Sequence, residues 1–497
     1  ALLNTTAVAT SVGILCLILG LPLAWLITRT DLPFREKFRS MFCLPYAIPP
    51  YVGAIGWIIL ANPSSGVLNQ WLGLSLNIYS FAGLVWVEAS FLFTFVLLGT
   101  LTALDKMDSS FEEAARLSGA SPLRVFWQIN LPLLRPALAH GFLLSFLATA
   151  ASFGVPALIG TPSRIYLMTT QIYSFQRMGT TNGLEIAFAL SVLLMLGSLI
   201  LLLVANRLLV KSRFAMVSGK TARASLMELG SWRWPVFTVL MGLWIWLFVL
   251  PLAGIALSAF SRVQGILTLE NLGFTNFYRV LFETEETHRA IFHSLGLGLA
   301  AALFCAFFSL GWGFLQSKHD WRTQTLGQVL LTLPFSTPGT VVALALIISF
   351  GRGIWGFGPA LNNTLSLIFI AYVVKYMSLA QKTVADGYSQ VHQSLEEAAR
   401  VAGANSWQVL TTIYAPILKP AAVAAAFLVF MPVVSELTMS VLLAGPGNET
   451  IGSLLFSLQE YSDVGGGGAA VLSLLVVGLI LALNFLLKIF SKGKYGI

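Results

Sequence analysis

Three ionisable side chains lie within otherwise apolar stretches of this 497-residue sequence: Glu88, Lys375 and Glu436. If those stretches cross a membrane, each charged group is costly there and is by default a candidate for a functional site. Carboxylates and an ammonium group could line a wet pathway. Lys375 and Glu436 could equally form a structural ion pair, and Glu88 could lie at the membrane interface.

Other chemistry finds little support. We find no His-Glu zinc motif, no nucleophile elbow and no convergent acid–base set, which disfavours an enzyme. The five histidines show no metal-ligand spacing, and the three cysteines give no disulfide framework. The segment "SGKT" (218–221) resembles the end of a phosphate-binding loop, but Phe214 stands where that loop needs glycine, so a basic linker is favoured.

Long apolar helices are the elements that must position these residues. The chain is 57% hydrophobic and 10% charged, whereas soluble proteins carry about 25% charged residues. Its apolar runs have the length of roughly 20 residues that a helix needs to cross a bilayer. The fold class is therefore predicted as an all-α membrane protein. The predicted spans are 6–28, 40–60, 81–104, 136–160, 184–207, 235–260, 290–316, 328–350, 364–386, 420–444 and 469–490.

The basic residues predict the orientation. If segment 29–40 is cytoplasmic, most of the 29 Lys and Arg residues fall in cytoplasmic segments, as the positive-inside rule requires. The exceptions are Lys375, within a span, and Arg164, Arg177, Arg262, Arg279, Arg289 and Arg352, outside. The net charge of +8 is thus explained by topology, and the clustered basic face of a nucleic-acid-binding protein is not seen.

Two polar phrases repeat within the apolar sequence. "FEEAARLSGASPLRVFWQINLPLLRP" (111–136) returns as "LEEAARVAGANSWQVLTTIYAPILKP" (395–420), and "LPYAIPP" (44–50) returns as "LPFSTPG" (333–339). Such repeats predict two tandem homologous bundles with a pathway between them. We expect a first half at 1–207, a cytoplasmic linker at 208–234 and a second half at 235–497. Since 235–260 has no counterpart in the first half, we expect another helix before Ala1 and twelve spans in the full protein.

Each polar phrase predicts a rigid helix–turn–helix. Ser110 with Glu113, and Ser394 with Glu397, have the spacing of a capping box. Glycines where each first helix should end favour the left-handed conformation, and Ser121-Pro122 or Asn405-Ser406 would begin a second helix. The small surface of "EEAAR" would let another backbone approach closely. Ordinary loops are rarely so regular, so two docking surfaces for a partner with two similar faces are predicted.

The phrases resemble the EAA loop of binding-protein-dependent ABC importer permeases, in the form that fuses both permease halves in one chain. The first copy matches the motif at Glu113, Ala114, Ala115, Gly119, Ile129, Leu131 and Pro132. The second matches it at Glu397, Ala398, Ala399, Gly403, Ile413 and Pro416, with Ala415 in place of the usual leucine. We expect this second loop to dock nevertheless, because the turn is retained.

The resemblance implies a multi-pass permease of the bacterial inner membrane that is not itself an enzyme. Two copies of a cytoplasmic ATPase subunit would bind ATP and Mg, and a periplasmic binding protein would deliver the cargo. The residues implied in coupling to the ATPase are Glu113, Ala114, Ala115, Arg116, Gly119, Glu397, Ala398, Ala399, Arg400 and Gly403.

The cargo is less well indicated. Segments 151–160 and 433–447 resemble the ferric-iron branch of fused permeases, which implies alternating-access import of iron. The candidate pathway residues are Glu436, Lys375, Glu88 and Ser152. Oxygen ligands that suit a hard cation are offered by Glu436, Glu460, Tyr461 and Asp463. Thiamine or another small organic solute is the alternative cargo, and no firm metal site is assigned.

A secondary transporter driven by an ion gradient is the alternative class. Such proteins often contain broken helices, and prolines could break two spans here or simply begin or kink them. These prolines are Pro45, Pro49, Pro50, Pro334 and Pro338.

Overall fold

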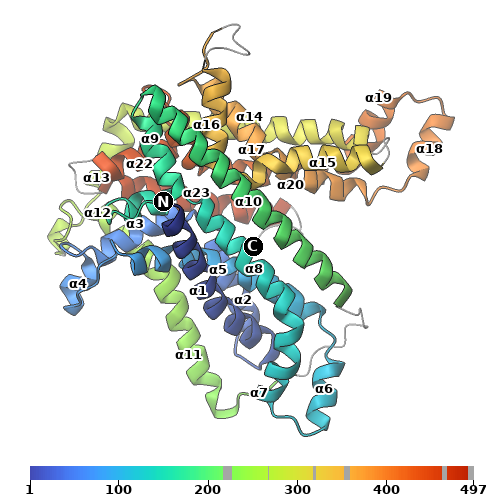
Figure 1. The fold of residues 1–497 in the computed structure, drawn as a ribbon, viewed down its shortest axis with the longest axis horizontal. Helices are drawn as coiled ribbons and strands as arrows, with labels where there is room; N and C mark the ends of the chain where they lie inside the picture. The colour runs from blue at the N-terminus through green and yellow to red at the C-terminus, as the bar shows by residue number, and fades with distance from the viewer. Residues whose placement is uncertain (216–225, 267, 317–320, 352–358, 462–466, 491–497) are drawn as a thin grey trace. The chain divides into compact units, whose positions relative to one another are not determined.

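The fold is entirely helical in the part of the chain that the computed structural model describes, which is residues 1–215, 226–266, 268–316, 321–351, 359–461 and 467–490 (Figure 1). In these residues, nine helices are long and apolar enough to cross a membrane, and two bent pairs raise the count to eleven. The predicted all-α membrane fold is confirmed. The "SGKT" segment and Asp463 lie outside the described residues.

Two predicted spans are broken helices. The segment from α2 (Arg35–Cys43) to Ala47 meets α3 (Pro50–Ala61) at 95°, and α15 (Trp321–Ser336) meets α16 (Gly339–Phe350) at 115°. Pro49 and Pro338 are extended at the two bends. Proline pushes the residue before it out of the helical conformation, so the "LPYAIPP" and "LPFSTPG" repeats break the spans rather than only beginning them.

One compact unit consists of residues 1–178, 193–258 and 263–267. Its central helices are α1 (Leu2–Arg29), α5 (Phe81–Lys106) and α8 (Leu131–Ala151). Glycines let these helices approach closely: a Cβ on Gly20 would lie 2.9 Å from Val96, and one on Gly13 would lie 2.6 Å from Phe142. Small residues at the contacts are the usual means of helix association in membranes.

The span predicted at 235–260 packs within this same unit, through α11 (Arg233–Trp244) and α12 (Leu250–Phe260). Trp246 lies 5.5 Å from Trp57 between ring centroids, and a Cβ on Gly56 would lie 2.4 Å from the carbonyl oxygen of Pro251. The packing unit therefore crosses the boundary at 208–234 that the sequence repeat predicts.

The other compact unit consists of residues 179–192, 259–262 and 268–497. Its central helices are α14 (Glu285–Gln316), α17 (Leu365–Tyr388) and α20 (Ala415–Val434). Glycines again allow close contact, since a Cβ on Gly298 would lie 2.9 Å from Val434 and one on Gly387 would lie 2.9 Å from Leu418. The three-helix core of the first unit is thus repeated here.

Two predicted spans differ from their helices. The predictions at 136–160 and 420–444 treat each as continuous, but α8 ends at Ala151 and α20 at Val434. A non-helical turn follows each, before the helical turn Pro156–Gly160 and α21 (Thr438–Leu443). The hydropathy of these segments stays high through the turns, which is why composition does not reveal the breaks.

Candidate functional site

The two polar phrases fold as matched helix–turn–helix loops, which we call the first polar loop (108–130) and the second polar loop (392–414). The first contains α6 (Ser110–Leu117) and α7 (Pro122–Val125), and the second contains α18 (Ser394–Val401) and α19 (Ser406–Val409). In Figure 1 each loop projects from the end of its own unit.

A left-handed glycine ends the first helix of each loop. Gly119 has φ +80° and Gly403 has φ +85°, a conformation that glycine adopts at no steric cost. In each turn the next residue donates its N–H to the carbonyl five residues earlier, from Ala120 to Ala115 and from Ala404 to Ala399, both at 2.9 Å. The predicted stop glycines are confirmed.

The N-caps predicted for the first helix of each polar loop differ from those in the structure. The capping boxes at Ser110 and Ser394 are wrong, because both serines are the first helical residues. Their N–H groups are bound by side chains two residues earlier, Asp108 Oδ1 at 2.9 Å and His392 Nδ1 at 3.2 Å. The backbone N–H and hydroxyl of Ser110 hold the pKa of Asp108 below its usual range.

The second short helices begin as predicted. Ser121 Oγ accepts the N–H of Arg124 at 3.4 Å, and Asn405 Oδ1 accepts the N–H of Gln408 at 2.9 Å. These caps satisfy N–H groups that a helix start leaves free.

Buried carboxylates anchor both loops, and sequence reasoning missed them. Glu112 is 2% exposed and its Oε1 binds Arg29 Nε of α1 at 2.8 Å. Glu396 is 7% exposed, and it binds Arg400 Nε and the Tyr414 hydroxyl, both at 2.8 Å. Glu112 therefore holds the first loop to α1, whereas Glu396 closes the second loop on itself through Tyr414, whose ring packs against Phe314 of α14. The doubled glutamate was the available signal, but its partners are not local in the first loop.

The residues implied in coupling lie mainly on the outer side of the loops. Glu397, Ala114, Ala398 and Arg400 are exposed. The remaining members are also accessible or part-buried, and these are Glu113, Ala115, Arg116, Gly119, Ala399 and Gly403.

Apolar side chains project from the loops at equivalent positions. Leu117 and Val401 are each 90% exposed although they follow the buried anchors closely. Four further residues at matched positions are exposed, namely Phe111 with Leu395 and Leu123 with Trp407. Exposed apolar patches rimmed by polar residues mark interaction sites, and here the same patch occurs twice.

Glu436 lies in the turn between α20 and α21. Its carboxylate accepts the N–H groups of Met439 and Ser440 at 2.9 Å, and the hydroxyl of Ser440 at 2.9 Å. Carboxylates at a helix N-terminus are stabilised by these free donors and by the helix dipole. The predicted pathway residue is thus a buried cap of α21.

Lys375 points to the bend between α15 and α16. Its Nζ donates to the carbonyls of Phe335, at 2.9 Å, and Thr337. A broken helix leaves such carbonyls without intrahelical partners. The ammonium group thus satisfies carbonyls at the bend, and a pathway role for Lys375 stays a prediction.

Glu88 lies inside its unit on α5 and not at an interface, being 1% exposed. The hydroxyl of Ser152, the fourth candidate pathway residue, lies beside it in the turn after α8. The two residues are therefore brought together.

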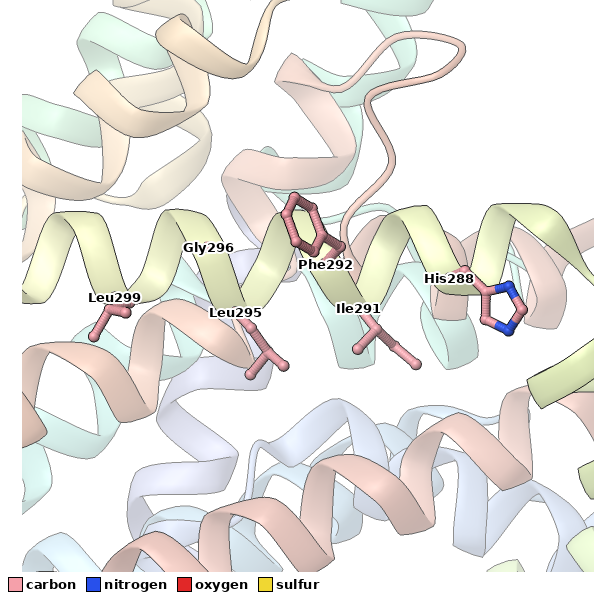
Figure 2. Close-up of a pocket in the computed structure, with 6 residues that line it drawn as sticks. All are labelled: His288, Ile291, Phe292, Leu295, Gly296 and Leu299. Atoms are coloured by element: carbon pink, nitrogen blue, oxygen red, sulfur yellow. The ribbon is translucent and has the colours of Figure 1, made fainter.

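The candidate oxygen ligands do not form a cluster in the described residues, where no three His, Cys, Asp or Glu side chains gather as a metal site. Glu460 is exposed, and the side chain of Tyr461 is outside the described set. A groove of about 480 Å³ runs along α14, but its walls are apolar apart from His288 (Figure 2). Hydrocarbon walls suit an acyl chain better than a charged cargo.

A hydrogen-bonded contact between a hydroxyl and a helix start, which we call the latch, occurs in both units. It lies at the end of the helices opposite the polar loops. Thr5 Oγ1 accepts the N–H of Met168, and Ser294 Oγ accepts that of Ile451, at 2.9 and 2.8 Å. These N–H groups begin α9 (Met168–Arg177) and α22 (Ile451–Tyr461). Each hydroxyl thus caps another helix and fixes it to α1 or α14.

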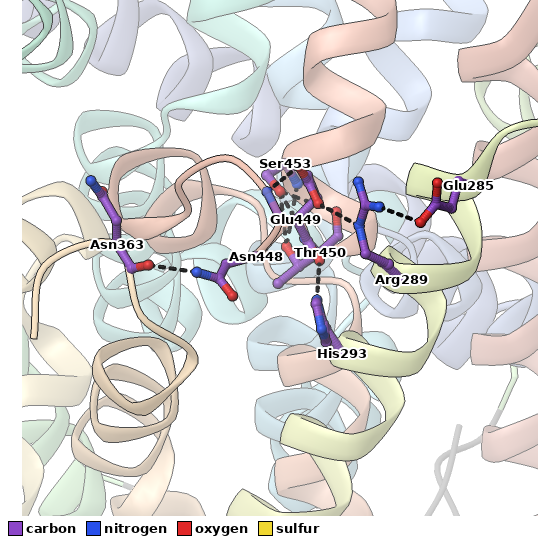
Figure 3. Close-up of polar contacts among 9 residues, drawn as sticks. Glu285, Arg289, His293, Asn363, Asn448, Glu449, Thr450 and Ser453 are labelled. Atoms are coloured by element: carbon purple, nitrogen blue, oxygen red, sulfur yellow. Dashed lines mark hydrogen bonds and ion pairs between the residues drawn. The ribbon is translucent and has the colours of Figure 1, made fainter.

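Asn4 and His293, which precede Thr5 and Ser294, make a second contact in each latch. Asn4 Nδ2 donates to the carbonyl of Tyr166 at 3.2 Å, and His293 Nδ1 lies 3.0 Å from the carbonyl oxygen of Glu449 (Figure 3). Burial raises the pKa of Glu449, but the N–H of Gly447 and the charge of Arg289 outweigh it and leave that pKa below its usual range.

We expect Thr5→Val with Ser294→Ala to speed amide exchange at Met168 and Ile451 by about tenfold or more. Each N–H would lose a buried acceptor, which costs about 1–3 kcal/mol. Thr6→Val is the control, because the Thr6 hydroxyl bonds only within its own exposed helical turn. Unchanged exchange at both amides in the double variant would contradict the latch.

Comparison with known proteins identifies the family. The sequence pattern described as the binding-protein-dependent transport system inner membrane component matches residues 17–213 and again residues 298–494. The chain belongs to this family. It is a fused ABC importer permease, a multi-pass inner-membrane protein with one family copy in each half.

Named relatives of the permease are modestly similar. A putative ferric transport system permease protein FbpB 1 of Haemophilus influenzae is 27% identical over 438 residues, covering 85% of this chain and 66% of the relative. The ferric transport system permease protein FbpB of Actinobacillus pleuropneumoniae is 26% identical, covering 97% and 70%. A putative 2-aminoethylphosphonate transport system permease protein PhnV of Salmonella paratyphi A is 27% identical, covering 49% and 89%. The permease thus spans about two thirds of the length of the two ferric relatives.

Proposed function

We propose that this permease imports ferric iron, driven by ATP hydrolysis in two separate cytoplasmic ATPase subunits that grip its two polar loops. The observation that carries this proposal is the matched apolar patch around Leu117 and Val401, presented twice on loops anchored by buried carboxylates. Two equivalent projections suit two identical ATPase copies, which would bind ATP and Mg.

The mechanism follows from the stiffness of the loops. Gly119 and Gly403 fix each turn, Glu112 fixes the first loop to α1, and Glu396 holds Tyr414, which packs the second loop against Phe314 of α14. A force applied to the patch is therefore passed to the helices rather than absorbed by the loop. Closure of an ATPase dimer on ATP would rock the two halves and alternate access to the pathway, and a periplasmic binding protein would deliver the cargo from outside.

Ferric iron is proposed as the cargo because two relatives covering most of this chain are named as ferric permeases. The residues offer limited chemical support, since Glu436 is committed to capping α21. A pathway without a tight metal site is consistent with transport, because a cargo bound too firmly is not released.

Reconstitution in lipid vesicles tests the function. With partner ATPase subunits and a periplasmic binding protein added, we expect uptake of radioactive ferric iron that requires ATP and stops without the binding protein. Thiamine and 2-aminoethylphosphonate serve as competing cargoes. Uptake driven by a proton or sodium gradient without ATPase would overturn the proposal, and ATP-driven uptake of a competing cargo alone would overturn its iron component.

We expect Leu117→Glu with Val401→Glu to abolish co-purification of the ATPase while leaving the permease folded. Both side chains are 90% exposed, and exposed substitutions usually change stability by less than about 0.5 kcal/mol. Trp71→Glu is the control, since Trp71 is 67% exposed on α4 (Val67–Leu72), in an outside loop of the predicted topology. Undiminished ATPase binding by the double variant would contradict the docking role.

A further inference from the structure

Each half buries one carboxylate in the same region of its own helix bundle. The two acids, Glu88 and Glu436, stand at sequence positions that do not correspond to each other. Ser80 caps α5 by accepting the N–H of Gly83, and Thr364 caps α17 by accepting that of Leu367. These caps set the two helices in register with the offset of 284 that also relates Gly119 to Gly403. Glu88 therefore corresponds to Tyr372, and Ser152 corresponds to Glu436.

In the second half this place is fully hydrogen-bonded. Tyr372 is 1% exposed and its hydroxyl lies 2.7 Å from Ser440 Oγ, which in turn donates to Glu436 Oε2 at 2.9 Å. Backbone N–H groups of α21 complete the shell of Glu436. Both oxygens of the Glu436 carboxylate therefore have donors, and the hydroxyl of Tyr372 closes the network from α17.

In the first half the buried acid lies on the long helix α5 and not in the turn after α8. Glu88 is 1% exposed on α5, and neither of its carboxyl oxygens has a hydrogen-bond donor among the described residues. The hydroxyl of Ser152 lies beside it, and the titratable group that interacts with it from α1 is the buried thiol of Cys16. No cation from the described residues faces it in an ion pair.

The free-energy cost of burying a charge determines whether the Glu88 carboxyl is ionised. An ionised carboxylate without partners in a low-dielectric interior is penalised by several kcal/mol, and such a group neutralises instead. Its equivalent in the second half, Tyr372, is a neutral hydroxyl bonded to Ser440 of α21, the short helix that follows the turn. A carboxylic acid at Glu88 would supply the same kind of group, a neutral O–H, beside Ser152.

We propose that Glu88 is a proton-binding site, held as a neutral carboxylic acid whose O–H takes the place of the Tyr372 hydroxyl. The ligand is a proton, and Ser152 is the acceptor in the turn after α8. Each half then carries one neutral O–H group at the same helix position, Glu88 on α5 and Tyr372 on α17.

Infrared difference spectroscopy of the full chain in lipid nanodiscs tests this assignment. Wild type minus Glu88→Gln at neutral pH is expected to contain the carbonyl band of a protonated carboxylic acid, and Ser152→Ala is expected to shift that band. Glu436→Gln is the matched control from the other half and should leave the band assigned to Glu88 unchanged. A difference spectrum for Glu88→Gln that contains only carboxylate bands would overturn the proposal.

Thermal unfolding separates a proton from a metal cation at the same place. We expect Glu88→Gln to unfold at the wild-type temperature, because the amide keeps an N–H donor, and Glu88→Ala to unfold at a lower one. Sodium or potassium chloride should not stabilise wild type beyond the Glu88→Gln variant when compared with an organic-cation chloride. Salt-specific stabilisation that disappears in Glu88→Gln would assign a cation instead and refute the proton site.

Discussion

Replacing both turn glycines, Gly119→Pro with Gly403→Pro, is expected to abolish ATP-driven uptake while the permease still inserts in the membrane. Proline fixes φ near −65°, whereas these residues have φ +80° and +85°. It also removes the N–H groups that donate to the carbonyls of Arg116 and Arg400. The measurement is iron uptake by reconstituted vesicles, with the amount of inserted protein determined separately.

Two other glycines provide a matched control. Gly73 and Gly179 also have positive φ, at +62° and +65°, and open space where a Cβ would stand. Gly73→Pro with Gly179→Pro introduces the same backbone conflict outside the polar loops, and we expect transport to persist. Equal loss in both double variants would show that the effect is general misfolding and not distortion of the docking turns.

Arg29→Ala is expected to release the first polar loop from α1, with a local destabilisation of about 3–5 kcal/mol. Removing one partner of a buried ion pair leaves the other charge unpaired in the interior, and Arg29 and Glu112 are both almost fully buried. The Leu104 carbonyl also loses one of its donors, Arg29 Nη2 at 3.0 Å, and keeps the N–H of Met107. Amide exchange across residues 108–130 should therefore become much faster, with exchange in the second polar loop unchanged.

A double-variant cycle checks the physical cause. Adding Glu112→Gln to Arg29→Ala should recover part of the loss, because no unpaired charge remains. The exposed pair Arg39–Asp105 is the control, and Arg39→Ala should cost about 0–1 kcal/mol, as surface pairs usually do. A cost for Arg29→Ala as small as that for Arg39→Ala would rule out the anchoring role of the buried pair.

Local chemistry explains what could be predicted from the sequence. Helix spans follow from hydropathy, and the turns at Gly119 and Gly403 follow from a residue type with a conformational preference of its own. The helix starts at Ser110 and Ser394 were misjudged because Asp108 and His392, two residues earlier, also offer acceptors. A pattern of serine and glutamate does not decide between such competing caps.

Contacts between distant segments explain what could not be predicted. Arg29 and Glu112 are 83 residues apart, and the latch between Thr5 and Met168 joins residues 163 apart. Glu436 was predicted as a pathway residue from its charge, but its role is decided by a helix break that high hydropathy conceals. The correspondence of Glu88 with Tyr372 could have been found by aligning the halves, although their types differ.

Cross-linking from the polar loops tests the central claim most directly. Leu117→Cys and Val401→Cys can be labelled selectively with a photoreactive maleimide, because Cys16, Cys43 and Cys305 are buried. With the ATPase subunits present, both positions should cross-link to them, and ATP should change the yield, whereas Trp71→Cys should not react with them. Absence of ATPase cross-links from both loop positions in a complex that still transports would contradict the account.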